Sequence, residues 1–363
     1  MDIKDALAKK RAAVDAAIEK YVPRTLDAKK AAFLLGKPRY VYDVNTAQKA
    51  VNDLVWDLLD RGGKRWRPAL MLWVAEAIGG KKKADALMDF AVIPEVVHNG
   101  TLVIDDLEDD SLQRRGKPCL HRLYGTDLAV NAGNAMYFLP LLSFAKKRIV
   151  SDARLLNAYE TAVQEMVNLS YGQGFDILWH KGHGNPTQDE YLQMCAFKTG
   201  TLARMAAKLG AILADGTPEQ VDAAGAFAEG LGIAFQIQDD ILNLVLPETA
   251  LEHDEHATSV LGKDSGEDIT EGKRSLLVIH ALGKLPKKEK QELLDILNAH
   301  TRDGKQIQLA ISLIKKTGAI PYAQQKAKSL VQDAWKKLEP LLLEGEAQNA
   351  LKALAYYAIE RKT

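Results

Sequence analysis

The stretch LVIDDLEDDSLQRRG, residues 102–116, ends an apolar helical run with a block of carboxylates and then two arginines. In a helix, positions i, i+1 and i+4 share one face, so Asp105, Asp106 and Asp109 project together. Like charges this close repel unless a cation lies among them, and Mg²⁺ prefers carboxylate oxygens completed by water and phosphate oxygens. A single acidic cluster is more often a solvated helix end, so the rest of the chain has to distinguish the two interpretations.

A second acidic cluster follows another apolar helix later in the chain. The run GIAFQIQ precedes DDILN at 239–243, as VVHNGTLVI precedes DDLED at 105–109. Asp239, Asp240 and Asn243 again share one helix face. This repetition favours a paired metal site over two unrelated surface patches.

Composition limits the classes of function. The 363-residue chain carries 48 basic and 48 acidic residues, and a neutral chain has no global field to recruit nucleic acid or an anionic membrane. Cys119 and Cys195 form no CxxC pair, and no strongly apolar stretch reaches the ~20 residues of a membrane span. The N-terminus is unlike a targeting peptide. We therefore expect a cytoplasmic protein with no nucleic-acid partner and no transmembrane segment.

Apolar residues recur with the 3.6-residue period of helices almost throughout, and the alternation typical of strands is nearly absent. The sequence thus predicts an all-α fold in one domain, residues 1–363. Glycine and proline mark the breaks between helices. The predicted helices cover residues 2–21, 44–60, 67–79, 83–107, 127–148, 151–179, 188–213, 217–246, 274–283, 287–299, 303–317, 322–342 and 346–361.

Basic residues gather beside glycines and beside the acidic clusters. The segment RGGKRWRP, residues 61–68, places Lys64, Arg65 and Arg67 at a predicted helix N-terminus, where free N–H groups also attract anions. Further cations follow the first acidic cluster, lie mid-chain and flank the second cluster: Arg114, Arg115, Lys198, Lys263 and Lys273. Each alone would usually be solvated. Together they predict a site for two phosphate groups, one held with metal and one by cations alone.

These motifs resemble those of the trans-isoprenyl diphosphate synthases. LVIDDLEDDSLQRRGKP resembles the first aspartate-rich motif of the family and GIAFQIQDDILNL the second. GGKRWRP, EVVHNGTLVIDD, YGQGFD, FKTG and GKDSGEDITEGKRSLLVIHAL also follow the family's order, between Gly62 and Leu282. The resemblance implies one large helical bundle around a deep central cavity, and a homodimer. It also implies Mg²⁺-dependent condensation of isopentenyl diphosphate with an allylic diphosphate.

The resemblance also assigns roles to individual residues. A cluster of Mg²⁺ ions on the allylic diphosphate would be held by Asp105, Asp106, Asp109, Asp239 and Asp240. The catalytic set, near the reacting carbon or the leaving diphosphate, would be Gln173, Lys198, Thr199, Gln236 and Lys263. The substrate-binding set would be Gly63, Lys64, Arg67, His98, Arg114, Arg115 and Lys273. Taken alone, His98 on an apolar helix would more often be a core histidine.

Product length is predicted from the helix before the first motif. In relatives that stop at farnesyl diphosphate, a bulky aromatic residue one turn before the motif closes the product tunnel. Gly100 and Thr101 occupy these positions here, so we expect an open floor and a longer product, with geranylgeranyl diphosphate as the best single choice. Replacing Gly100 with Phe is then expected to shorten the product. Possible parts of a lower floor are Tyr137, Phe138 and His121.

Several features depart from the family or favour simpler interpretations. Asn243 stands where the second motif usually ends in aspartate, and the connection from Asn243 to Gly262 is longer than usual in relatives. HDEH at 253–256 has zinc-like spacing, but a polar loop is the better interpretation. Arg361 and Lys362 weakly resemble a basic tail that closes over the site in relatives. Tyr171, Phe175 and Trp179 recur at helical spacing, which predicts packing.

Other functions stay open at this stage. Farnesyl, geranylfarnesyl or longer products would use the same chemistry. A class I terpene cyclase would share the first cluster but lacks the GGKRWRP anchor for a second diphosphate. A non-catalytic subunit of a heteromeric synthase usually loses an acidic cluster or the arginine pair, and both are present here. A purely structural bundle gives no reason for these charged motifs.

Overall fold

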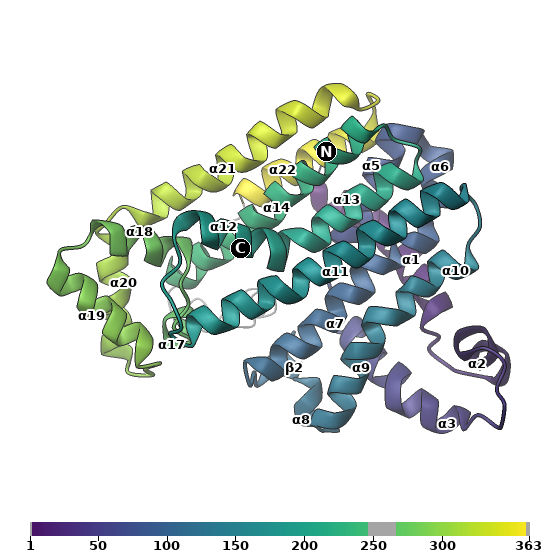
Figure 1. Ribbon diagram of the computed structural model, residues 1–363, viewed down its shortest axis with the longest axis horizontal. Helices are drawn as coiled ribbons and strands as arrows, with labels where there is room; N and C mark the ends of the chain where they lie inside the picture. The colour runs from purple at the N-terminus through teal and green to yellow at the C-terminus, as the bar shows by residue number, and fades with distance from the viewer. Residues whose placement is uncertain (1, 246–265, 361–363) are drawn as a thin grey trace. The chain divides into compact units, whose positions relative to one another are not determined.

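The computed structural model describes residues 2–245 and 266–360, and most of them are helical (Figure 1). The all-α prediction is therefore confirmed. The described chain groups into two compact units. The first comprises residues up to 161 with 206–221 and 342–351, and the second comprises 162–205, the described part of 222–341, and 352–360. The expectation of one domain over residues 1–363 stays a prediction.

The first unit contains most of the predicted N-terminal helices and two short ones that periodicity missed. Asp27 caps one of these, because its side chain accepts a hydrogen bond from the Lys30 N–H at 2.8 Å. The elements are α1 (Ile3–Tyr21), α2 (Ala28–Leu35), α3 (Val44–Ala47), a π-helical segment (Gln48–Asn52), α4 (Asp53–Asp60), α5 (Trp66–Gly79), α6 (Lys81–Ala86), a 3₁₀ turn (Met88–Phe90), α7 (Val92–Glu108), α8 (Leu120–Tyr124), α9 (Thr126–Phe138), a 3₁₀ turn (Leu139–Leu141) and α10 (Leu142–Lys146).

Helices α7 and α9 lie side by side in the first unit, and glycines allow their close approach (Figure 1). A Cβ on Gly100 would lie 2.9 Å from the Met136 Cβ and 3.0 Å from the Gly133 carbonyl oxygen. A Cβ on Gly133 would lie 2.9 Å from the Ile104 Cδ1. Gly100 therefore lies in the contact between α7 and α9, and the prediction that it leaves an open tunnel floor is wrong.

A short hairpin follows α7, which the sequence patterns did not predict. Strands β1 (Gln113–Arg114) and β2 (Lys117–Pro118) pair antiparallel. The two turn residues both have left-handed backbones, with φ 54° at Arg115 and 73° at Gly116. Such a two-residue turn matches the right-handed twist of the strands. The hairpin thus returns Arg114 toward the end of α7 and Arg115 toward the loop before α5.

Four further helices contribute residues to both units: α11 (Asp152–His180), α13 (Thr201–Leu213), α14 (Pro218–Val245) and α22 (Glu346–Glu360). The remaining elements belong to the second unit. They are α12 (Gln188–Cys195), a π-helical segment (Ala196–Gly200), α17 (Glu267–Thr270), α18 (Leu276–Lys284), α19 (Lys287–Asn298), α20 (Gly304–Lys315), α21 (Ala319–Leu338) and a 3₁₀ turn (Glu339–Leu341). Thr187 and Glu190 form a reciprocal capping box at the start of α12.

Two glycines hold the π-helical segment Ala196–Gly200 against its neighbours in the second unit. A Cβ on Gly172 of α11 would lie 2.6 Å from the Phe197 carbonyl carbon and would also clash with the Lys198 nitrogen. A Cβ on Gly232 of α14 would lie 2.5 Å from the Gly200 Cα. The helix predicted over 188–213 is therefore interrupted at the point where backbones pack directly on one another. Such π-helical turns occur frequently at functional sites.

One run among the described residues, Thr126–Lys146, has the length and composition of a membrane span, with a mean hydropathy of 1.3. Of the 18 consecutive residues that give this mean, 39% are buried in the structure. Pro140 lies in the 3₁₀ turn that separates α9 from α10, and α9 packs along α7. A helix in the core of a soluble protein can have the same length and composition, so these two properties do not assign the run to a membrane.

Candidate active site

The first acidic cluster lies at the C-terminal end of α7 in the first unit. Asp106 is 3% exposed, and Asp105 and Asp109 are half-buried. The Arg114 Nε donates to the Asp106 Oδ1 at 2.7 Å, and its Nη2 lies 3.5 Å from the Asp105 Oδ2. Arg114 was predicted to bind substrate. In the structure its guanidinium holds two carboxylates of the predicted metal site.

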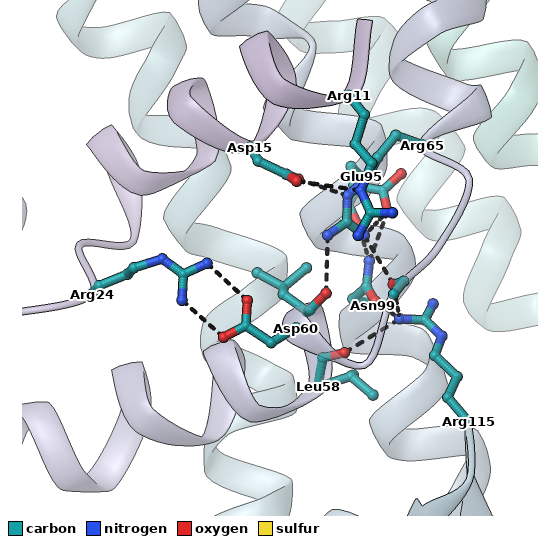
Figure 2. A network of polar contacts seen from close by, with 11 residues as sticks. Arg11, Asp15, Arg24, Leu58, Asp60, Arg65, Glu95, Asn99 and Arg115 are labelled. Carbon is teal, nitrogen blue, oxygen red and sulfur yellow. Dashed lines mark hydrogen bonds and ion pairs between the residues drawn. The ribbon is translucent and has the colours of Figure 1, made fainter. Parts of the chain in front are cut away.

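A concentration of positive charge surrounds the loop before α5. The Arg115 Nη1 donates to the Gly62 carbonyl oxygen at 2.6 Å and to that of Leu58 at 3.3 Å (Figure 2). Gly63 has φ 128°, and a Cβ there would lie 3.0 Å from the Arg65 Nη1 and 3.5 Å from the Arg115 Nη2. Both the backbone conformation and the two guanidinium groups therefore require glycine at this position.

His98 of α7 lies among these cations. Burial and the positive charges of Arg67 and Arg115 lower the pKa of the His98 imidazole well below 6.5. The ring is therefore neutral at pH 7, and it leaves the guanidinium groups as the charges that attract an anion. The predicted ligands in this region all lie in the first unit: Gly63, Lys64, Arg67, His98, Arg114 and Arg115.

Two of the predicted catalytic residues of the second unit, Thr199 and Gln236, form a hydrogen-bonded chain from the π-helical segment to the second acidic cluster, and Lys198 pairs with Asp176 beside them. The Lys198 Nζ lies 2.6 Å from the Asp176 Oδ2. The Thr199 hydroxyl donates to the Gln236 Oε1 at 2.9 Å, and the Gln236 Nε2 donates to the Asp240 Oδ1 at 2.9 Å. The structure thus brings together residues that the sequence placed in separate motifs. Gln173 lies on α11, one turn before Asp176.

Asp240 is the most buried carboxylate of the second cluster, with 4% exposure. Burial and the neighbouring charge of Asp268 raise the pKa of the Asp240 carboxyl well above its ordinary value. The Tyr191 hydroxyl donates to the Asp240 Oδ2 at 2.7 Å. A divalent cation beside this carboxylate would relieve the charge repulsion that raises its pKa.

Lys273 and Asn243 organise the segment that follows. The Lys273 Nζ lies 2.9 Å from the Asp268 Oδ1 and 2.8 Å from the Glu271 Oε2. The Asn243 Oδ1 accepts a hydrogen bond from the Asp268 N–H at 3.3 Å. Asn243, which stands where the family usually has aspartate, therefore links the start of α17 to α14 through its amide oxygen.

The donor chemistry fits Mg²⁺ bound together with a diphosphate. Among residues 2–245 and 266–360, no three Asp, Glu, His or Cys side chains form a ready-made metal cage. Each acidic cluster instead offers a few hard carboxylate oxygens on one helix face. Mg²⁺ keeps several waters and is typically bound by one or two carboxylates plus substrate phosphates.

Some sequence predictions fail or lie outside the described residues. Phe138 is 66% exposed, so its placement in a tunnel floor is wrong for the described chain. The aromatic row on α11 does pack, but on itself: the ring centroids of Tyr171 and Phe175 lie 6.4 Å apart and those of Phe175 and Trp179 lie 6.0 Å apart, while Tyr171 is 62% exposed. Tyr137 instead points toward α7, because a Cβ on Gly100 would lie 3.4 Å from its Cε1. The predictions for Lys263, HDEH at 253–256, Arg361 and Lys362 fall on residues that the structure does not describe.

Sequence reasoning missed three residues that contact the predicted site: Tyr191, Glu95 and Asn99. The sequence around Tyr191 indicates only core packing, because a tyrosine at helical spacing does not reveal its hydrogen-bond partner. Glu95 did carry one, because a carboxylate within the apolar run AVIPEVV is rarely buried without a partner.

Comparisons with known proteins show the family to which the chain belongs. The profile of the polyprenyl synthetase family matches residues 48–314. A short chain isoprenyl diphosphate synthase of Methanothermobacter thermautotrophicus is 34% identical over 84% of this chain and 88% of its own length. A geranylgeranyl diphosphate synthase of Methanosarcina mazei is 30% identical over 100% of this chain and 99% of its own length. The crystal structure of geranylgeranyl pyrophosphate synthetase from Pyrococcus horikoshii superposes with a TM-score of 0.83 at 28% identity, covering 99% of this chain and 98% of that one.

Proposed function

Because the chain belongs to the polyprenyl synthetase family and elongates trans-prenyl diphosphates, we propose that its main product is geranylgeranyl diphosphate. The observation that carries the chemistry is the coexistence of two acidic clusters with a separate cluster of cations, which would hold a diphosphate without metal. The two acidic clusters suit a substrate whose diphosphate leaves to form an allylic cation. The cation cluster suits a second substrate that keeps its diphosphate, and a terpene cyclase requires no such substrate.

We propose that the residues on one face of each acidic helix bind the metal and the allylic diphosphate: Asp105, Asp106, Asp109, Asp239 and Asp240. When bound, Mg²⁺ neutralises the leaving diphosphate and so favours cleavage of the allylic C–O bond. Arg114 orients the first carboxylates, and Tyr191 orients Asp240. Lys198, Lys263 and Lys273 add positive charge for the diphosphate that departs with the electron pair.

Isopentenyl diphosphate occupies the metal-free site in this proposal. Lys64, Arg67 and Arg115 supply charge, and the neutral His98 supplies a hydrogen bond. Holding the diphosphate there fixes the double bond for attack on the allylic carbon, which removes much of the entropic cost of a two-substrate reaction. Attack forms the new C–C bond. The departed diphosphate then accepts the proton whose loss restores a double bond.

The polar chain on the π-helical segment surrounds the developing positive charge. The Thr199 hydroxyl and the Gln236 side chain are oriented by their hydrogen bond of 2.9 Å, and Gln173 is the third oxygen donor in this proposal. Oxygen dipoles fixed before the reaction stabilise a cation without paying for reorganisation during it. The proposed role is therefore electrostatic, with no covalent intermediate on the protein.

The product-length proposal now rests on Thr101 and not on Gly100. Thr101 is half-buried, and its hydroxyl donates to the His98 carbonyl oxygen at 2.7 Å. Replacing Thr101 with Phe is expected to shift the main product from twenty toward fifteen carbons, because the added ring narrows the path of the growing chain. Chromatography of dephosphorylated products measures the shift. Thr101→Ser is the control that keeps the hydroxyl, and an unchanged product from Thr101→Phe would contradict the assignment.

The direct test of the proposed function is product analysis. Purified protein is incubated with Mg²⁺, radiolabelled isopentenyl diphosphate and each of the five-, ten- and fifteen-carbon allylic diphosphates. A twenty-carbon product is the expected result. A longer ladder would retain the chemistry and change the product, whereas no condensation with any partner would favour a non-catalytic subunit.

We further propose a homodimer that is formed through α11. Exposed apolar residues recur every three or four positions along this helix: Leu156, Tyr159, Val163, Val167, Tyr171, Phe175 and Leu178. Such a long exposed apolar stripe is unusual for a monomer and typical of an interface. Val167→Lys is expected to convert a dimer into a monomer in sedimentation velocity, while Gln291→Lys on the exposed face of α19 leaves the dimer intact. A monomeric wild type would contradict the proposal.

A further inference from the structure

A buried ion-pair network ties the N-terminal helix α1 to the loop before α5 (Figure 2). Arg65 is only 3% exposed, and Asp15 and Glu95 hold its guanidinium from two helices. The Arg65 Nε donates to the Asp15 Oδ1 at 2.9 Å, and its Nη1 donates to the Glu95 Oε1 at 2.9 Å. The Nη2 donates to the Leu59 carbonyl oxygen at 3.0 Å. A guanidinium this deeply buried depends on such partners, because removing one leaves charge without compensation.

The same network reaches Arg115, one of the proposed diphosphate ligands. Glu95 Oε1 also accepts from the Asn99 Nδ2 at 3.0 Å. The Arg115 Nη1 lies 3.3 Å from the Asn99 Oδ1, and Asn99 is fully buried (Figure 2). The position of Arg115 is therefore coupled to the position of Glu95 through a side chain that has no room to move.

The backbone of Arg65 makes the loop sensitive to these contacts. Arg65 has φ 52°, in the left-handed region that L residues rarely adopt, and it is the residue immediately before α5. Its Nη1 also lies over Gly63. Side-chain contacts must hold such a conformation, since the backbone alone disfavours it. Loss of a partner of Arg65 thus frees the segment that carries Lys64.

We propose that Asp15 is a positioning residue for the metal-free diphosphate site. It acts through Arg65 on the loop that carries Lys64, and through Glu95 and Asn99 on Arg115. The inference rests on the proposed function, because it names what holds the isopentenyl diphosphate site in shape. Asp15 lies outside the segments that resemble the family motifs, which begin at Gly62.

A contact at the other end of α1 provides a matched control. Asp89 anchors the C-terminal end of α1, because it lies 2.5 Å from the Lys20 Nζ and accepts from the Tyr21 hydroxyl at 3.3 Å. Asp89→Asn therefore loosens the docking of α1 without removing a partner of Arg65. A merely structural role for Asp15 predicts the same behaviour for both substitutions, whereas a positioning role does not.

Calorimetric titration of isopentenyl diphosphate into the full chain with EDTA present isolates the metal-free site. Asp15→Ala is expected to weaken binding about tenfold, roughly the effect of losing one charge-assisted hydrogen bond. Asp15→Glu should recover most of the affinity, and Asp89→Asn should bind as the wild type does while unfolding at a lower temperature. Wild-type affinity in Asp15→Ala would overturn the inference. The inference would also be overturned if Asp89→Asn weakened the binding of isopentenyl diphosphate as much as Asp15→Ala does, or if the wild-type protein bound none.

Steady-state assays on the same preparations with Mg²⁺ separate this inference from the proposed function. Asp15→Ala is expected to raise KM for isopentenyl diphosphate while kcat and KM for the allylic substrate stay near wild-type values. Parallel changes in all three constants would show a general structural defect and overturn the inference. Metal-free binding without turnover in the wild type would contradict the proposed function and leave the positioning role supported by the titration.

Discussion

Replacing Asp105 with Asn is expected to lower kcat for condensation by about a thousandfold, or roughly 4 kcal/mol of transition-state stabilisation. The substitution keeps the shape of the side chain but removes a negative charge from the end of α7. An amide oxygen holds a divalent cation less strongly than a carboxylate does, so less charge is available to neutralise the departing diphosphate. Initial rates at saturating allylic and isopentenyl diphosphates, over a range of Mg²⁺ concentrations, measure the loss.

Glu108→Gln is the matched control for Asp105→Asn. Glu108 is an exposed acidic residue on the same helix, and it belongs to none of the proposed metal ligands. This variant should keep kcat within about twofold of wild type, because exposed charges contribute little at physiological salt. A full rate in Asp105→Asn, or an equal loss in both variants, would contradict a specific metal-binding role for the first cluster.

Replacing Gly172 with Ala is expected to destabilise the protein by about 3 kcal/mol and to reduce condensation strongly. The new methyl group would lie 2.6 Å from the Phe197 carbonyl carbon, and neither α11 nor the π-helical segment can yield without moving its backbone. Moving the π-helical segment displaces Lys198 and the Thr199–Gln236 hydrogen bond. Thermal unfolding and the condensation rate measure the two effects.

Gly174 provides a control two residues away on the same helix. A Cβ on Gly174 meets no atom of its own chain within 4 Å, so Gly174→Ala adds a better helix former and a single methyl group to the apolar face of α11 without a clash within the protomer. This variant should be unchanged or more stable by about 0.5–1 kcal/mol. Equal stabilities of Gly172→Ala and Gly174→Ala would show that the close contact of α11 with the π-helical segment is not real.

The family comparisons also bear on the open alternatives. Membership of the polyprenyl synthetase family confirms the resemblance on which the site assignments rest. A second diphosphate site at Arg67 and Arg115, as proposed above, would distinguish the protein from a cyclase that ionises a single diphosphate. The relatives include enzymes with short-chain and geranylgeranyl products, so product length is a property of this chain's own residues.

Local patterns were sufficient to determine the helical class and the site motifs. Helical periodicity depends on near neighbours, so α11, α14 and α22 were predicted within one residue of their observed ends. The helix predicted over 83–107 is instead divided into α6, a 3₁₀ turn and α7. The acidic clusters were visible for the same reason, because residues i, i+1 and i+4 share a face wherever a helix forms. Asp105, Asp106, Asp239 and Asp240 therefore needed no tertiary information to be singled out.

Tertiary structure decided what depends on residues far apart in sequence. Gly100 appeared to leave space, but α9 fills it, because what lies opposite a glycine is set by the neighbouring helix. The π-helical turn at Ala196–Gly200 depends on the close approach of α11 and α14, and no local propensity encodes it. Likewise, Asp15 gains its contact with Arg65 only when α1 docks, since 50 residues separate the two along the chain. Periodicity shows which face of a helix is apolar, but packing decides which residue meets that face.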